Sequence, residues 1–243
     1  MERCEGTLHE KQVIVLGGSS GIGLETARLA DAQGAKLVLV ARDVHKLEAA
    51  SHALGGSART AIFDVADEGA VRTFFEHIGR IDHVLLAAGN PFYAPLVQMN
   101  FSEARRYIDN RILSILYIAR YAGPHMVPAG SLIFLSGTLI QRPALGLSVT
   151  SIAGHATGTL TKNLALELAP TRVNTIACGF VDTPLSAALL GEGLQARREE
   201  LERTLPIHRV VQPEDVAKLA VHLMLNTAIT GSTYAIDGGQ SLL

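Results

Sequence analysis

The sequence has little of several features that would mark particular classes of protein. Its 243 residues include only two cysteines, Cys4 and Cys178, too few for a disulfide framework or a cysteine metal site. No apolar run approaches the roughly 20 residues that a membrane-spanning helix needs. The first twelve residues are polar and of mixed charge, so we expect no signal peptide. These absences favour a protein of the reducing cytoplasm, without a metal.

An excess of charge of either sign is also missing. The formal net charge is −2, so the composition gives no reason to expect nucleic acid or an anionic membrane as a partner. Apolar residues make up 48% of the chain, which is enough for a large buried core. The length suits one domain over residues 1–243, and we expect a small-molecule substrate.

Short apolar segments alternate with longer helical patterns along the chain. Seven segments are leucine-rich or β-branched at both parities, as expected of strands covered on both faces: 13–16, 37–41, 60–63, 84–87, 132–135, 172–176 and 233–236. Helices are predicted near residues 21–33, 43–54, 67–78, 102–122, 150–169 and 213–225. This alternation predicts an α/β fold, a Rossmann-type doubly wound parallel sheet of about seven strands with helices on both faces.

The charged segment over residues 186–203 interrupts this alternation. In open α/β sheets the ligand binds beyond the carboxyl ends of the strands. A helical segment inserted at this point would cover a substrate there. A plain surface helix explains the sequence equally well, and both interpretations stay open.

A glycine-rich loop, Gly17-Gly18-Ser19-Ser20-Gly21-Ile22-Gly23, follows the first predicted strand and opens a helix. Its first glycine permits a tight turn, the middle one lets the backbone approach a pyrophosphate, and the last lets the helix pack on the strand. The unpaired N–H groups of a helix N-terminus favour phosphate. The residues expected to bind a dinucleotide are Gly17, Ser19, Ser20, Gly21 and Ile22.

The end of the second predicted strand bears on which dinucleotide is bound. An acidic residue there would bind the ribose hydroxyls of NAD, but Ala41 occupies the place and Arg42 follows. Arginine suits the 2′-phosphate of NADP through charge-assisted hydrogen bonds. Asp43 either caps the next helix or binds a ribose hydroxyl. The sequence therefore favours NADP(H) over NAD(H).

Further motifs complete a resemblance that covers nearly the whole chain. They are Asp64-Val65, Ala87-Ala88-Gly89, residues 164–170, Arg172-Val173-Asn174, residues 178–184, residues 213–217 and residues 229–239. Together with the glycine loop, and in this order, they resemble the short-chain dehydrogenase/reductase family. The resemblance implies a homodimer or homotetramer.

The resemblance also implies contacts with the rest of the cofactor. Asp64 and Val65 would contact the adenine, although Asp64 alternatively caps the next helix. The positions that would follow the ribose and the nicotinamide are Ala87, Ala88, Gly89, Gly179, Val181 and Thr183.

The side chains that carry the proton chemistry of that family are missing. Members use a Tyr-x-x-x-Lys pair on one helix, a serine thirteen residues before the tyrosine, and an asparagine on an earlier helix. Counting from the flanking motifs puts the tyrosine, lysine, serine and asparagine positions at Thr150, Gly154, Gly137 and Arg111. Threonine has no accessible pKa, whereas the reference pKa of tyrosine is ~10. The usual acid is therefore absent.

Few polar residues are available to replace these groups. Ser136 adjoins the serine position and is the candidate for a carbonyl or nicotinamide contact. Arg111 either binds an anionic substrate, where Arg142 would join it, or forms a structural salt bridge. His155 lies about 100° around the helix from the lysine position and is expected at a surface or interface.

The helix that lacks the tyrosine shows a further pattern. Residues spaced by four predict its buried stripe: Ile152, Ala156, Leu160, Leu164 and Leu168. Gly154 and Gly158 lie off this stripe, and a glycine costs a helix interior ~1 kcal/mol relative to alanine. Both therefore indicate close approach of a cofactor, a substrate or a partner helix.

The sequence thus predicts an NADP(H)-dependent oxidoreductase with a non-standard active site and an unknown substrate. Loss of a positioned acid typically slows a reaction by ~10²–10⁴-fold, but the hydride belongs to the cofactor. Transfer to an activated alkene or an iminium needs no strong acid. Two alternatives stay open, a catalytically silent NADP(H)-binding sensor or partner subunit, and a non-redox enzyme on the same fold.

Overall fold

The computed structural model describes residues 7–138 and 144–243, and its centre is a parallel sheet of seven strands. The strand order is β3-β2-β1-β4-β5-β6-β7, with every neighbouring pair parallel. The strands are β1 (Gln12–Leu16), β2 (Lys36–Ala41), β3 (Arg59–Ile62), β4 (Ile81–Leu86), β5 (Met126–Gly137), β6 (Arg172–Cys178) and β7 (Thr233–Ile236). The order reverses between β1 and β4, which confirms the doubly wound topology.

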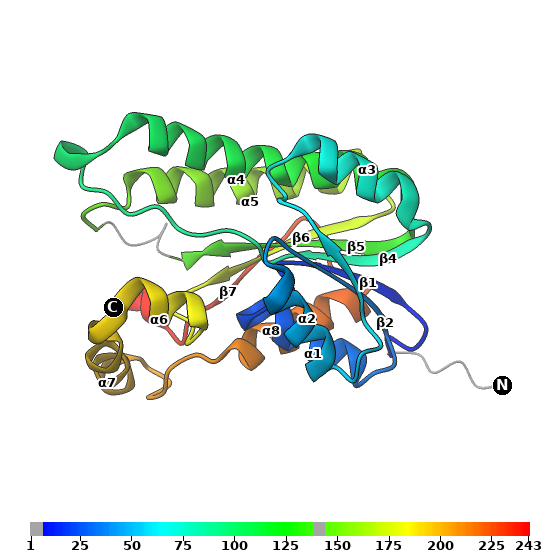
Figure 1. Cartoon of the computed structure of the whole chain (residues 1–243). Coiled ribbons are helices and arrows are strands. Elements are labelled where there is room, and N and C mark those ends of the chain that lie inside the picture. Colours follow the sequence, from blue (N-terminus) through cyan, green and yellow to red (C-terminus); the bar gives the residue numbers. More distant parts are fainter. Residues whose placement is uncertain (1–6, 139–143) are drawn as a thin grey trace.

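Helices cover both faces of the sheet (Figure 1). One face carries α3 (Glu68–Ile78), α4 (Phe101–Ala122) and α5 (Ser148–Glu167), and the other carries α1 (Gly21–Asp31), α2 (Val44–Ala53) and α8 (Pro213–Leu225). Beyond the carboxyl ends of the strands lie α6 (Pro184–Leu190) and α7 (Leu194–Thr204). Short 3₁₀ turns span Leu96–Gln98, Gly123–His125, Gly191–Gly193 and Gln240–Leu242. None of the helices in the described ranges is long and apolar enough to cross a bilayer.

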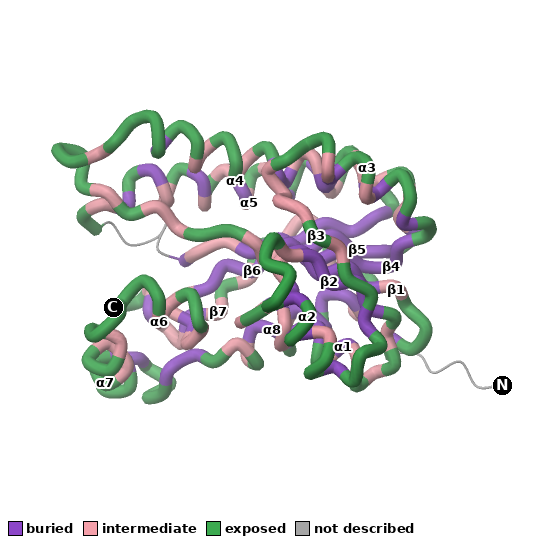
Figure 2. Tube along the Cα trace, in the orientation of Figure 1, coloured by how far each residue is buried: buried purple, intermediate pink, exposed green. Residues whose placement is uncertain are grey.

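The core consists of two apolar layers, one on each side of the sheet. Alternate residues of β1 enter different layers, because Val13 and Val15 face one cluster while Ile14 and Leu16 face the other. The tube in Figure 2 is accordingly buried along the central strands and exposed on the outer faces of the helices. Burial on both faces explains why successive residues of each strand segment are apolar, whichever face of the sheet they point to.

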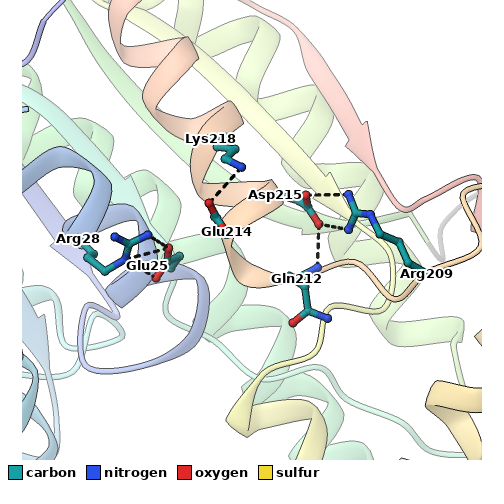
Figure 3. Close-up of polar contacts among 7 residues, drawn as sticks. All are labelled: Glu25, Arg28, Arg209, Gln212, Glu214, Asp215 and Lys218. Carbon is teal, nitrogen blue, oxygen red and sulfur yellow. Dashed lines mark hydrogen bonds and ion pairs between the residues drawn. The ribbon is translucent and has the colours of Figure 1, made fainter. Parts of the chain in front are cut away.

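The start of α8 is fixed by a set of polar contacts (Figure 3). Asp215 accepts a hydrogen bond from the Gln212 backbone N–H at 2.9 Å and pairs with both terminal nitrogens of Arg209 at 2.6 and 2.9 Å. This pairing with Arg209 lowers the pKa of the Asp215 carboxyl. The contacts orient α8 so that its apolar face packs against α1.

The buried face of α5 differs from the predicted stripe. Ile152 is 59% exposed, and the buried residues are Val149, Ala153, Thr157, Thr161 and Leu164. The Thr157 and Thr161 hydroxyls donate to backbone carbonyls one turn earlier, at 2.9 and 2.8 Å. Because these bonds satisfy the hydroxyls inside the core, the threonines are buried despite their polarity. The prediction that Ile152 is buried was therefore wrong, whereas Leu164 of the same predicted stripe is buried and Ala156, Leu160 and Leu168 are half-buried.

Candidate functional site

A cleft of about 420 Å³ is lined by the loops that follow the central strands, by α4 and α5, and by the α6–α7 segment. Its volume lies within the range of small-molecule sites. The strands β1 and β4, where the sheet order reverses, both end at this cleft. The cleft therefore occupies the position where open α/β sheets bind ligands.

The glycine loop between β1 and α1 is shaped by close backbone contacts. Gly17 has a φ of +92°, and a Cβ there would lie 2.5 Å from the Ala88 nitrogen. A Cβ on Gly23 would collide with the Gly17 carbonyl oxygen. No side chain caps the first turn of α1, although Ser20 stands at the N-cap. The N–H groups of that turn are therefore left for an external acceptor, which fits a pyrophosphate.

The loops after β2 and β3 bring Arg42 and Asp64 together in an exposed ion pair at 3.4 Å. The Arg42 side chain is 71% exposed and is free to turn toward a ligand. Asp43 caps α2 and Asp67 caps α3, each accepting a backbone hydrogen bond at 3.1 Å. The structure therefore shows the capping alternative for Asp43, whereas α3 is capped by Asp67 and not by Asp64.

Most of the predicted site residues lie at this cleft or on the loops around it. The four positions predicted for the family's tetrad all line it, and so does Ser136. The predicted cofactor residues in its wall are Ile22, Ala87, Gly89, Gly179, Val181 and Thr183. Gly21 is the first residue of α1, and the others lie on the loops after β1, β2, β3 and β4: Gly17, Ser19, Ser20, Arg42, Asp64, Val65 and Ala88.

Thr150, at the tyrosine position, uses its hydroxyl on the backbone. The hydroxyl accepts a hydrogen bond from the Phe92 N–H at 3.1 Å and donates one to the Phe92 carbonyl. The Phe92 ring in turn stacks on Tyr107, with centroids 5.7 Å apart. Thr150 therefore holds the loop between β4 and α4 and is not available as an acid.

Arg111, at the asparagine position, is held by backbone carbonyls. Its guanidinium donates to the Leu135 carbonyl and, at 3.5 Å, to the Ala88 carbonyl. No ion pair of Arg111 is present within residues 7–138 and 144–243, so the salt-bridge alternative is not what the described structure shows. Burial lowers the pKa of Arg111, and Tyr107 nearby partly opposes this effect.

The Ser136 hydroxyl and the Cys178 thiol also line the cleft. The Ser136 hydroxyl donates at 3.4 Å to the carbonyl of Gly154, the residue at the position predicted for the family's lysine. Burial raises the pKa of the Cys178 thiol to about 12, so this thiol stays protonated at neutral pH. This part of the cleft therefore contains the Ser136 hydroxyl and the Arg111 guanidinium, and its Cys178 thiol is not ionised.

The sequence missed several residues of the wall and could not place others. Tyr93, Tyr107 and Phe180 line the cleft without any local signal. The segment predicted over residues 186–203 contributes Ser186, Leu189, Leu190 and Arg197 to the wall. His155 is exposed, as expected, and its ring contacts the Ser151 carbonyl at 2.9 Å.

Arg142 lies outside the residues that the structure describes. Among the described residues, no three histidine, cysteine, aspartate or glutamate side chains form a cluster that could hold a metal ion.

Known proteins resemble this chain over almost its entire length. A family profile described as enoyl-(acyl carrier protein) reductase matches residues 17–241. The 3-oxoacyl-[acyl-carrier-protein] reductase of Bos taurus is 31% identical over 241 residues, which cover 96% of this chain and 99% of the relative.

Solved structures agree with this similarity. The MalC reductase/Diels-Alderase of Malbranchea aurantiaca has a TM-score of 0.91 at 25% identity, with 99% of this chain and all of that chain covered. A small-chain dehydrogenase in complex with NADPH has a TM-score of 0.83 at 26% identity, with 96% and 100% covered. Motifs, strand order and these similarities together show that this chain belongs to the short-chain dehydrogenase/reductase family of oxidoreductases.

Proposed function

We propose that this chain is an NADP(H)-dependent reductase whose active site works without the tyrosine and lysine of α5. One observation carries the proposal. The cleft combines Val181 and Thr183 at the predicted nicotinamide end with Ser136 and Arg111, while the Thr150 hydroxyl is bound to Phe92. The site thus keeps the wall for a nicotinamide and replaces the acid by other polar groups.

The loops after β1 to β4 support the cofactor assignment. The uncapped first turn of α1 would hold the pyrophosphate, and Arg42 would pair with the 2′-phosphate of NADP. Gly21 has a φ of +53°, which favours glycine at the start of α1, and the Thr183 side chain lies directly beside it. The solved NADPH complex of a relative is consistent with this preference. Bound NADPH would supply the hydride.

Ser136 and Arg111 are the groups that we assign to the substrate. The Ser136 hydroxyl would donate a hydrogen bond to it, and Arg111 would contribute positive charge beside it. Neither group is a good proton donor at neutral pH, so acceptors that need no strong acid fit best. An activated alkene, as the name of the matching family profile suggests, or an iminium satisfies this condition.

The α6–α7 segment would cover the substrate. Leu189 and Leu190 line the cleft, and Arg198 ties α7 to Asp182 on the loop after β6 at 2.8 Å. An apolar cover excludes water from the hydride acceptor and strengthens the electrostatic contacts inside.

Calorimetric titration with NADPH and NADH tests the cofactor assignment. NADPH is expected to bind at least ~10-fold tighter, because charge-assisted hydrogen bonds are worth ~1.5–3 kcal/mol. Arg42→Ala should remove most of this preference and leave NADH binding unchanged. Arg72→Ala, on an exposed part of α3, is the matched control. A chain that binds neither nucleotide would overturn the proposal.

A silent NADP(H)-binding sensor is the second candidate, favoured by the engagement of the Thr150 hydroxyl and the absence of a lysine at Gly154. Oxidation of NADPH measured with crotonyl-CoA, with a cyclic N-methyl iminium and with acetoacetyl-CoA separates the two. The reductase should consume NADPH with one of the first two probes and little with acetoacetyl-CoA. A sensor binds NADPH and consumes none. Because the MalC protein is named a reductase/Diels-Alderase, a non-redox reaction on this fold also stays a candidate.

A further inference from the structure

The cleft contains a cation that lacks an acidic partner. Arg111 lines the cleft, and its hydrogen bonds within the described ranges go to the carbonyls of Ala88 and Leu135. No aspartate or glutamate is among the residues described in the wall of the cleft. Residues 139–143, which the structure does not describe, contain none in their sequence. Within the part of the chain that the structure describes, the positive charge of Arg111 is therefore balanced by carbonyl dipoles and by no carboxylate.

Some N–H groups of the Arg111 guanidinium have no hydrogen-bond acceptor among the described residues. A guanidinium offers a planar fork of N–H groups that matches a carboxylate with two parallel hydrogen bonds. The two carbonyls engage one donor on each terminal nitrogen and leave the remaining N–H groups without a partner in the described structure. Removing such a charge from water costs several kcal/mol unless a counter-charge is present. An anionic ligand would supply that counter-charge.

Tyr107 adds a second donor to the same part of the cleft. It lies one turn before Arg111 on α4 and lines the same cleft. Its ring is oriented by stacking on Phe92, whose backbone is held by Thr150. A hydroxyl at the end of an oriented ring is suited to donate to an oxygen of a bound anion.

The wall contributed by the α6–α7 segment is largely apolar, unlike the part of the cleft around Arg111 and Tyr107. Leu185, Leu189 and Leu190 of α6 line the cleft there. Arg197 of α7 also lines it, but this arginine is paired with Glu200 at 2.7 Å. Arg111 is thus the one cation in the described wall whose charge is not already paired.

We propose that the substrate of this cleft is an amphipathic carboxylate. Its carboxylate binds Arg111 through two hydrogen bonds and receives a third from Tyr107, while its apolar body lies against Leu185, Leu189 and Leu190. This inference rests on the proposed function and names the substrate class of the same site.

Calorimetric titration with octanoate and with 1-octanol, each with and without saturating NADP⁺, tests the inference. The two probes share an apolar chain and differ in the head group. Octanoate is expected to bind at least ~10-fold tighter than 1-octanol, since charge-assisted hydrogen bonds contribute ~1.5–3 kcal/mol. Equal affinity, or tighter binding of 1-octanol, would overturn the inference.

Three variants locate the head group. Arg111→Gln should lower the affinity for octanoate at least ~10-fold and leave that for 1-octanol unchanged. Tyr107→Phe should lower octanoate affinity by about 3-fold to 10-fold, as expected for one hydrogen bond. Arg72→Gln, at an exposed position of α3 that does not line the cleft, is the matched control and should leave octanoate affinity unchanged. No loss in Arg111→Gln, or an equal loss in Arg72→Gln, contradicts the inference.

The controls separate this inference from the proposed function. If Arg111→Gln does not fold, Tyr107→Phe and the octanoate-to-octanol ratio of the unmodified chain decide the question. A chain that binds NADP⁺ but prefers no carboxylate refutes the substrate class alone. A chain that binds octanoate through Arg111 but no nucleotide refutes the proposed function and retains the carboxylate site.

Discussion

Among residues 7–138 and 144–243, the hydrogen bonds of Arg111 and of Arg172 go only to backbone carbonyls, yet these two arginines lie at opposite ends of the sheet. Arg172 opens β6 at the amino end and is 4% exposed. Arg111 lies at the carboxyl end, against the backbone that follows β4 and the last part of β5. Arg172 donates, at 2.6 to 3.3 Å, to the carbonyls of Ala129, Leu223, Met224 and Ile229.

The two arginines differ in the groups that offset their positive charge. Two of the carbonyls around Arg172 belong to the last turn of α8, where the helix dipole is negative, so its charge is offset inside the protein. Arg111 has fewer carbonyl partners and faces a cleft. The amino end therefore uses a buried charge to hold elements together, whereas we propose that the carboxyl end keeps one for a ligand.

The largest effect is expected from Arg172→Met. Leaving several buried carbonyls without a donor should lower the free energy of unfolding by about 3–5 kcal/mol, measured by urea denaturation. NADPH affinity of the folded fraction should not change, because the cleft is at the other end of the sheet. A loss below about 1 kcal/mol would remove the structural role assigned to Arg172.

A pH-dependent effect of similar size is expected from His83, also at the amino end. Its ring contacts the Ser131 hydroxyl at 2.9 Å, and burial lowers its pKa from 6.5 to about 4. Between these two values the unfolded chain binds more protons, so stability falls as the pH falls from 6.5 to 4. The loss is about 3 kcal/mol over the whole window.

Urea denaturation at several pH values measures this effect. His83→Gln should have a flatter dependence between pH 6.5 and 4, whereas His155→Gln, on the exposed face of α5, should follow the unmodified chain. Parallel profiles for His83→Gln and the unmodified chain would show that this histidine is not kept neutral by burial.

A smaller effect is expected from Thr150→Val at the carboxyl end. The substitution removes both hydrogen bonds to the Phe92 backbone and should cost about 1–2 kcal/mol in the free energy of unfolding. Thr159→Val, at an exposed position of the same helix, is the matched control. If both variants lose the same stability, the contact with Phe92 contributes nothing of its own.

The smallest effect on stability is expected from Arg111→Met. Replacing a charge without an acidic partner by an apolar side chain should change the free energy of unfolding by less than about 1 kcal/mol in either direction. Thermal unfolding of the two methionine variants side by side measures the contrast directly. If Arg111→Met lowers the free energy of unfolding as much as Arg172→Met does, Arg111 has a structural role and the two arginines do not differ as we propose.

The fold followed from the sequence because its signals are local. Each strand is a short apolar segment, and Gly17 and Gly23 stand where backbone contacts leave no room for a Cβ. The buried face of α5 did not follow, because hydropathy ranks Ile152 above Thr157 and ignores the hydrogen bond that lets the threonine be buried. Propensity and spacing do not record such bonds.

The site was predicted in part. The positions of Arg111, Ser136 and Thr150 followed from motif spacing, and the structure places all three at one cleft. The contact between Thr150 and Phe92 joins residues that are 58 apart in the chain, and Tyr107 reaches the cleft only because α4 lies beside α5. Contacts of this kind depend on packing between elements, for which a single sequence carries no local signal.

The contact of Thr150 with Phe92 also determines what a single substitution at position 150 would do. A tyrosine at position 150 would carry its hydroxyl at the far end of a ring, away from the backbone groups that the short threonine side chain reaches. Thr150→Tyr would therefore release the loop while supplying a phenol, and Gly154 would still supply no ammonium group to lower the pKa of that phenol. A phenol at position 150 is thus not by itself enough to give this cleft the proton donor that the family resemblance implies.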